Sequence, residues 1–254
     1  MRLGPVVFEP WAEVLLDAVR VSPGDDVLDV ASGTGVVARA AAGRAGPEGR
    51  VVGTDVSEPM LSLAAARPLP DGSAPIEYLE ARADRLPFPD DSFDAVLCQQ
   101  GLQFFGERLE AAREMHRVAR PGGTVGAAVW AAGYRLEPFD DYAEALAATG
   151  VEPPFPRAFD NSAFVMSDGA ARKLFEDAGF EAVDVSVVER TVAFPDPGAA
   201  ADGILGTPFG PVVAALPGEQ SESLRADLLR RFHPESPREP VRRTTAAVIV
   251  RATK

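Results

Sequence analysis

Cysteine is almost absent from this chain of 254 residues, and Cys98 is its only representative. An internal disulfide and a metal site built from several cysteines are therefore excluded. The first ten residues, MRLGPVVFEP, are interrupted by Pro5, Glu9 and Pro10 and do not form the apolar run of a signal peptide. No segment approaches the roughly 18 uninterrupted apolar residues of a membrane span. These absences predict a cytoplasmic protein that is not embedded in a membrane and holds no metal.

An excess of basic side chains is also missing. The chain has 25 Lys and Arg against 38 Asp and Glu, which gives a formal net charge of −13. Nucleic-acid binding depends on clustered positive charge that neutralises phosphates, so a nucleic-acid partner is not expected. A small-molecule substrate remains the expected partner, and the oligomeric state is left open.

Apolar periodicity predicts an alternation of strands and helices in the first half of the chain. Strands are expected at 27–30, 50–55, 76–81, 93–99, 124–130, 180–192 and 244–252, and helices at 8–20, 35–45, 58–67, 107–120, 140–148, 167–178 and 221–232. Pro121-Gly122-Gly123 is expected to end a helix before the fifth strand, and 194–197 to form a break. This order is typical of α/β proteins with a parallel, doubly wound sheet, whose ligands bind at the carboxyl ends of the strands.

The stretch VLDVASGTGVV at 27–37 carries small residues immediately after a predicted strand. Gly33, Gly35 and Ala38 match the relaxed dinucleotide fingerprint Gly-x-Gly-x-x-Ala. Asp55 ends the next strand, twenty residues after Gly35, where an acid can bind ribose hydroxyls. The pattern predicts an adenine nucleoside with an unphosphorylated ribose. By itself it leaves NAD and other adenosine cofactors open.

Four ordered segments narrow the choice: VLDVASGTG, VVGTDVSEPML, EARADRLPFPDDSFDAVLCQQGLQFF and EMHRVARPGGTV. Together they resemble the class I S-adenosylmethionine-dependent methyltransferases, nearest the small-molecule, quinone-methyltransferase-like (type 11) branch. The resemblance covers 27–130 and continues more weakly through AGFEAVDVSVVE. It implies one Rossmann-like methyltransferase domain over 1–254, with a seven-stranded, mostly parallel sheet whose last strand is antiparallel. Within it, 21–130 would be the cofactor-binding half, and 131–164 and 195–238 would be helical lid insertions over the active site.

The resemblance also implies roles for individual residues. Gly33 and Gly35 would pass close to the methionine and ribose, Asp55 would hold both ribose hydroxyls, and Ala31 stands where many relatives have glycine. The remaining cofactor residues would be Asp29 at the loop or the amino group, Val56 and Met60 beside the adenine, Ala83 and Asp84 at its edge, and Gln99 at the methionine end.

Charge provides an argument from the residues themselves. S-adenosylmethionine carries a sulfonium and an ammonium group, whereas NAD brings a pyrophosphate that a carboxylate would repel. Asp29, inside the first strand, therefore favours the cationic cofactor. An NAD-dependent oxidoreductase remains the alternative, although the chain shows no evident Tyr/Lys or His set for hydride transfer.

The acceptor is expected to be a small, apolar or aromatic molecule, methylated on oxygen or carbon. Candidate acceptor residues follow the ends of the strands or begin the N-terminal helix: Phe8, Trp11, Gln103, Phe104, Trp130 and Tyr134. His116, His233 and Cys98 are interpreted as structural, so no general base is assigned. A non-catalytic module that binds S-adenosylmethionine therefore remains a third possibility.

Overall fold

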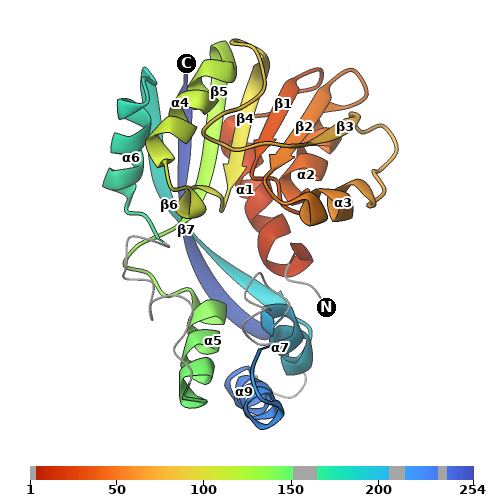
Figure 1. Ribbon diagram of the computed structural model, residues 1–254, viewed down its shortest axis with the longest axis vertical. Helices are drawn as coiled ribbons and strands as arrows, with labels where there is room; N and C mark the ends of the chain where they lie inside the picture. The colour runs from red at the N-terminus through yellow and green to blue at the C-terminus, as the bar shows by residue number, and fades with distance from the viewer. Residues whose placement is uncertain (1–3, 151–164, 206–214, 234–238) are drawn as a thin grey trace. The chain divides into compact units, whose positions relative to one another are not determined.

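The computed structural model describes residues 4–150, 165–205, 215–233 and 239–254. The described strands form one seven-stranded sheet with the order β3-β2-β1-β4-β5-β7-β6 (Figure 1). They are β1 (Asp26–Val30), β2 (Arg50–Asp55), β3 (Ile76–Glu80), β4 (Phe93–Gln99), β5 (Ala119–Trp130), β6 (Ala182–Phe194) and β7 (Val241–Thr253). The predicted seven-stranded, Rossmann-like α/β sheet is confirmed.

Strands β1 to β5 are parallel in the pairs β3-β2, β2-β1, β1-β4 and β4-β5. Strand β7 runs the other way. Its end pairs with the start of β5, since the Gly122 N–H donates to the Lys254 carbonyl, and its start lies near the end of β5, where the Ala131 N–H donates to the Ala246 carbonyl. The expected antiparallel last strand is therefore present, inserted between β5 and β6.

The helices alternate with the strands in the first half of the chain. They are the π-helical turn η1 (Gly4–Phe8), α1 (Glu9–Val19), α2 (Val36–Ala45), α3 (Glu58–Ala65), the 3₁₀ turn η2 (Leu102–Phe104), α4 (Arg108–Val118), α5 (Glu137–Ala148), α6 (Asp168–Asp177), α7 (Pro197–Leu205) and α9 (Gly218–Arg231). The strand order runs outward from β1 in both directions, so right-handed crossovers place α2 and α3 on one face and α4 on the other. Within the described ranges, none of these helices combines the length and apolarity needed to span a bilayer.

The chain divides into two compact units. The sheet unit consists of Trp11–Val129, Met166–Val188 and Ala247–Lys254. The helical unit consists of Met1–Pro10, Trp130–Val165 and Glu189–Ala246, and its helices α5, α7 and α9 pack on one another. Parts of the predicted lid insertions, at 151–164, 206–214 and 234–238, lie outside the described residues. That the insertions cover the active site stays a prediction.

One expectation about the elements was wrong. Pro121-Gly122-Gly123 does not separate α4 from a strand, because β5 already begins at Ala119. The Gly122 N–H and the Gly123 carbonyl both pair with Lys254, so a partner remote in sequence holds the segment extended. The break expected at 194–197 is present: β6 ends at Phe194, and Pro195 and Asp196 separate it from α7, which begins at Pro197. Pro197 can begin α7 because proline is tolerated in the first turn of a helix.

Helix α1 lies directly on β5 at Gly126. A Cβ atom added to Gly126 would lie 2.2 Å from Val19 Cγ2 and 3.0 Å from Leu15 Cδ1, while Leu15 is fully buried. Glycine is therefore required here for the helix to approach the sheet closely.

We expect Gly126→Ala to lower the free energy of unfolding by about 1–3 kcal/mol, because the stiff Val19 side chain cannot move away without displacing α1. Urea unfolding measures the change. Gly43→Ala is the matched control, since Gly43 lies inside α2 with nothing within 4 Å of an added Cβ. The control should be stabilised by about 0.5–1 kcal/mol. Equal effects of the two substitutions would contradict this account of α1 packing.

Candidate functional site

Most predicted cofactor residues lie at the carboxyl ends of β1 to β4 in the sheet unit. Strands β1 and β4 are neighbours, and the strand order leaves them in opposite directions, which makes this edge a topological switch point. The residues at these ends are Asp29 and Ala31 at β1, Asp55 and Val56 at β2, Ala83 and Asp84 after β3, and Gln99 on β4.

The glycine turn after β1 adopts the left-handed conformation that its composition permits. Gly33 has φ 54° and Gly35 has φ 72°. A Cβ atom at Gly35 would lie 2.2 Å from the Tyr78 hydroxyl oxygen, so no side chain fits there without displacing Tyr78. The Ser32 N–H donates to the Thr54 carbonyl at 2.8 Å, which fixes the turn to the end of β2.

Asp55 joins three segments of this edge. Its Oδ2 accepts a hydrogen bond from the Gly33 N–H and its Oδ1 one from the Ser57 N–H, both at 2.9 Å. Its carbonyl accepts from the Ala81 N–H at 3.0 Å. Each carboxylate oxygen retains a second lone pair, so the side chain can organise the turn and still accept from ribose hydroxyls.

Asp29 is only 1% exposed and lies beneath the glycine turn. Its Oδ2 accepts the Ala38 N–H at 2.9 Å. Burial raises the pKa of Asp29 to about 8, and the negative charge of Asp55 adds to the rise. A cationic ligand group nearby would favour the charged carboxylate, so the acid pair fits the ammonium or sulfonium of S-adenosylmethionine. The same hydrogen bond occupies a donor of the α2 N-terminus that a pyrophosphate would need.

Strained backbone marks the tips of the two central strands. Ala31 has φ 57° and Gln100 has φ 54°, a region that costs a non-glycine residue of order 1–3 kcal/mol. Ala31 is accommodated because its neighbour is Gly101, where an added Cβ would lie 2.8 Å from both Ala31 Cβ and Cys98 Sγ. The alanine that replaces the family's glycine therefore depends on a glycine across the edge.

We expect Gly101→Ala to lower the free energy of unfolding by about 1–3 kcal/mol, since its Cβ collides with Ala31. In an Ala31→Gly background the same substitution should be milder by about 1 kcal/mol, because one of the two clashing methyl groups is gone. A double-mutant cycle by urea unfolding measures this coupling. Simple additivity of the two changes would refute the contact.

The predicted adenine residues differ in how they are held. Met60 lies close to the turn, since its Sδ is 3.8 Å from the Cβ position of Gly33, and Val56 is 65% exposed beside it. Asp84 is engaged by Arg82, whose Nε and Nη2 lie 2.9 and 2.5 Å from its two carboxylate oxygens. Asp84 therefore faces a cation in the free protein, which keeps its pKa below the usual range.

Three glutamines gather at the end of β4. Gln99 belongs to the strand itself, and the Gln103 side-chain amide donates to Gln100 Oε1 at 3.1 Å. Gln100 and Gln103 are 9% and 6% exposed, yet Gln100 Nε2 and Gln103 Oε1 have no partner among the described residues. Buried amide groups without partners are rare in folded proteins and often mark a place where a ligand or water completes them. The sequence already showed three amides, those of Gln99, Gln100 and Gln103, at this strand end, and the structure places the Gln100 side chain against Gln103.

The predicted acceptor residues divide between the units. In the sheet unit Phe104 is 60% exposed on η2, while Trp11 is fully buried in the core. In the helical unit the rings of Phe8 and Trp130 lie 6.5 Å apart, and those of Trp130 and Phe139 lie 5.5 Å apart. Tyr134, also of the helical unit, is exposed. The structure thus brings Phe8 and Trp130 into one aromatic cluster.

His116 and Cys98 both pack against other residues of the sheet unit. His116 packs its ring edge-on against Phe180 at 4.8 Å, and burial lowers its pKa. Cys98 is fully buried, which raises the pKa of its thiol to about 12. This packing is what the structural interpretation made from the sequence leads one to expect; that neither residue takes part in catalysis stays a prediction.

Comparison with known proteins finds similarity in the first half of the chain. Residues 28–126 match the family model described as a methyltransferase domain. The ubiquinone/menaquinone biosynthesis C-methyltransferase UbiE of Hahella chejuensis is 40% identical over 114 residues, which are 44% of this chain and 46% of that protein. An uncharacterized protein of Mycobacterium tuberculosis is 40% identical over 124 residues, 49% of this chain and 44% of that one. The match spans less than half the length of these curated relatives.

Solved structures share the fold over nearly the whole chain. A putative methyltransferase from Bacillus halodurans is similar with a TM-score of 0.60 and 22% identity, covering 96% of this chain and 98% of that one. The [4+2]-cyclase SpnF is similar with a TM-score of 0.59 and 20% identity, covering 96% and 80%. At these identities the likeness shows the fold alone.

The strand order, the acid-flanked glycine turn and the family match over 28–126 agree with one another. The family is the one expected from the sequence, and S-adenosylmethionine is its cofactor. The chain carries a class I S-adenosylmethionine-dependent methyltransferase domain.

Proposed function

We propose that this protein transfers a methyl group from S-adenosylmethionine to a small, apolar or aromatic organic acceptor, on oxygen or carbon. The observation that carries the proposal is the pair Asp29 and Asp55 on either side of the left-handed turn at Gly33 and Gly35. A cation and a ribose are the two features of the cofactor that such a pair can recognise together.

S-adenosylmethionine would supply an electrophilic methyl group on a sulfonium centre. The chain's own residues would bind and orient it: Asp55 at the ribose, Asp29 at the cationic end, and Val56 and Met60 beside the adenine. Gln99 would face the methionine end. Alignment of acceptor, methyl and sulfur can contribute several kcal/mol to the rate, up to about 7–11 kcal/mol for well-oriented reactants.

The acceptor side is supported by the end of β4. Phe104 exposes an aromatic ring, and the adjacent Gln100 and Gln103 provide a neutral amide donor and acceptor rather than a charge. This combination suits an aromatic or otherwise apolar acceptor with a neutral oxygen group. The name of the UbiE relative favours carbon as the methylated atom.

Two alternatives remain as outcomes of the test. An NAD-dependent oxidoreductase would have to place a pyrophosphate near Asp29 and an α2 N-terminus whose Ala38 N–H is already occupied. A non-catalytic binding module would bind the cofactor without turnover.

Isothermal titration with S-adenosylhomocysteine and, separately, with NADH tests the cofactor. We expect micromolar binding of S-adenosylhomocysteine and none of NADH; the reverse result would refute the proposal. Release of S-adenosylhomocysteine from S-adenosylmethionine across phenols, hydroquinones and amines then tests turnover. Binding with no turnover on any of these acceptors would favour the binding module.

A further inference from the structure

The loop after β3 carries the predicted adenine residues between two anchors. At its start the Ala81 N–H donates to the Asp55 carbonyl at 3.0 Å, and Arg82 pairs with Arg85 in an isolated bridge. Its other anchor begins at Leu86, whose N–H donates to Glu114 Oε2 at 2.7 Å. Ala83 and Asp84 lie between these two anchors. The second anchor therefore limits the positions that the loop can adopt.

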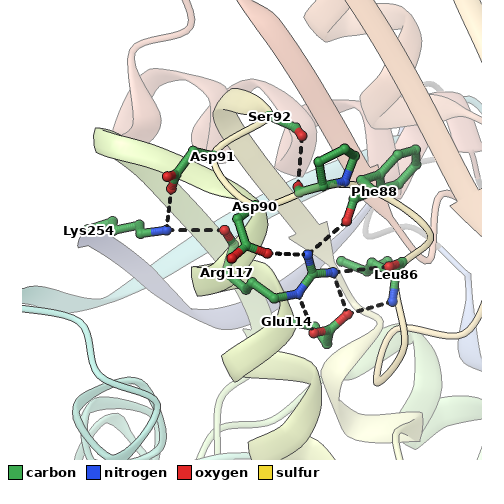
Figure 2. A network of polar contacts seen from close by, with 9 residues as sticks. Leu86, Phe88, Asp90, Asp91, Ser92, Glu114, Arg117 and Lys254 are labelled. Carbon is green, nitrogen blue, oxygen red and sulfur yellow. Dashed lines mark hydrogen bonds and ion pairs between the residues drawn. The ribbon is translucent and has the colours of Figure 1, made fainter.

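Arg117 of α4 builds most of the second anchor (Figure 2). Its Nη2 donates to the Leu86 carbonyl at 3.0 Å and its Nη1 to the Phe88 carbonyl at 2.7 Å. Nη1 also binds Asp90 Oδ1 at 2.8 Å. The planar guanidinium satisfies two loop carbonyls that would otherwise need other donors, which a point charge could not do with the same geometry.

Glu114 holds Arg117 in place for this task. The Arg117 Nε and Nη2 donate to the two oxygens of Glu114 at 2.7 and 2.8 Å, a bidentate pair one helical turn apart. Glu114 also accepts a hydrogen bond from the Leu86 N–H. Glu114 and Arg117 together therefore bind Leu86 at both its N–H and its carbonyl. A single side chain would fix only one of these groups, so the orientation of the peptide depends on both.

The rest of the network belongs to the same loop and to the residue after β7. Lys254 Nζ donates to Asp91 Oδ1 at 2.6 Å and to the Arg117 carbonyl at 3.1 Å, and Figure 2 shows both contacts. The Asp91 N–H also donates to the Arg117 carbonyl at 3.1 Å. The motif LPFPDDSF, read from the sequence as part of the cofactor half, is thus bound to α4 along its length.

Arg120 provides a structural comparison two residues beyond α4. It pairs with Asp26 at 2.7 Å and with Asp94, which lie at the starts of β1 and β4, away from the carboxyl edge. Its side chain is 38% exposed, close to the 30% of Arg117. The two arginines therefore make similar numbers of charged contacts, but Arg120 binds side chains at the starts of the strands, whereas Arg117 binds the 86–90 segment.

We propose that Arg117 and Glu114 are positioning residues for cofactor recognition: they hold the 81–86 loop so that its residues meet the adenine edge. The inference rests on the proposed function. Neither residue touches the cofactor; both act through the peptide of Leu86. Arg117 and Glu114 control how well the site distinguishes adenine from other purines, more than they control the stability of the fold.

The experiment compares Arg117→Gln with Arg120→Gln in the full chain. Isothermal titration with S-adenosylhomocysteine and with S-inosylhomocysteine, whose purine lacks the exocyclic amine, gives a ratio of dissociation constants. We expect the wild type and Arg120→Gln to prefer the adenine ligand by about tenfold or more, and Arg117→Gln to lose most of that preference. Glu114→Gln, which keeps the side-chain shape, should reduce it partially. Urea unfolding of each variant provides the stability reference.

A ratio unchanged in Arg117→Gln would overturn the inference, whatever its stability. So would an equal loss of preference in both arginine variants. Should Arg117→Gln fail to fold, Arg117→Lys replaces it. An intact preference in that variant would overturn the inference, because the three N–H donors of lysine cannot replace the five bonds that the guanidinium makes. A wild type that binds neither ligand would instead defeat the proposed function.

Discussion

Asp55→Ala should weaken S-adenosylhomocysteine binding at least about 100-fold. Hydrogen bonds to a charged partner are worth about 1.5–3 kcal/mol each, and the carboxylate is expected to accept from both ribose hydroxyls. The substitution also removes the acceptors of the Gly33 and Ser57 N–H groups, so the turn itself loses its fixed position. Isothermal titration measures the dissociation constant.

The control for this prediction is Asp94→Ala. Asp94 also accepts a backbone hydrogen bond, from the Asp26 N–H at 2.9 Å, and binds an arginine, but it lies at the opposite end of the sheet. Its affinity for S-adenosylhomocysteine should equal that of the wild type within about twofold. An unchanged affinity in Asp55→Ala would remove Asp55 from the cofactor site.

Asp29→Asn should separate stability from cofactor binding. In the folded protein the carboxyl of Asp29, with its pKa raised to about 8 by burial, keeps its proton through neutral pH, whereas in the unfolded chain it loses the proton near pH 4. Between these values the folded state binds more protons, so the free energy of unfolding falls as the pH rises, by up to about 1.4 kcal/mol per pH unit. Asparagine still accepts from the Ala38 N–H and cannot ionise. At pH 8 the variant should therefore be more stable than the wild type by about 1–3 kcal/mol.

The same substitution should weaken S-adenosylhomocysteine binding by about 10- to 100-fold, because a neutral amide cannot offset the ligand's ammonium group. Urea unfolding at pH 6, 7 and 8 and titration at pH 8 measure the two effects. Asp140→Asn is the control: Asp140 is 4% exposed in the helical unit, burial raises its pKa, and it accepts the Leu136 N–H. The control should leave cofactor affinity unchanged. A loss of stability without a loss of affinity in Asp29→Asn would assign Asp29 a purely structural role.

The physical cost of the site is concentrated in few residues. A buried carboxyl at Asp29, left-handed backbone at Ala31 and Gln100, and buried amide atoms without partners all lie at the tips of β1 and β4. Functional sites commonly retain such strain where the surrounding fold is stable enough to hold it. Their coincidence at the switch point agrees with the placement of the ligand there.

The local sequence pattern was sufficient to predict strands β1 to β4 of the cofactor-binding half. The alternation of apolar runs with Gly-, Pro- and Asp-containing turns predicted β1 to β4 within a residue or two, because these strands are short, buried and separated by strong turn signals. The spacing of Gly33, Gly35 and Asp55 predicted which residues meet at the ligand edge, since parallel strands bring their carboxyl ends together.

Long-range pairing decided what the pattern missed. Pro121 to Gly123 is strand only because Lys254, more than 120 residues away in sequence, supplies its partners, and Trp11 became core because α1 lies flat on Gly126. The left-handed state of Ala31 depends on Gly101, and the anchor at Arg117 depends on carbonyls of a different segment. The sequence by itself determined the order of the helices and strands and the chemistry of the acid-flanked turn. Tertiary structure decided the backbone strain, the burial and which side chains hold the loops. These properties arise from contacts between segments that are distant in sequence, and no local pattern records such contacts.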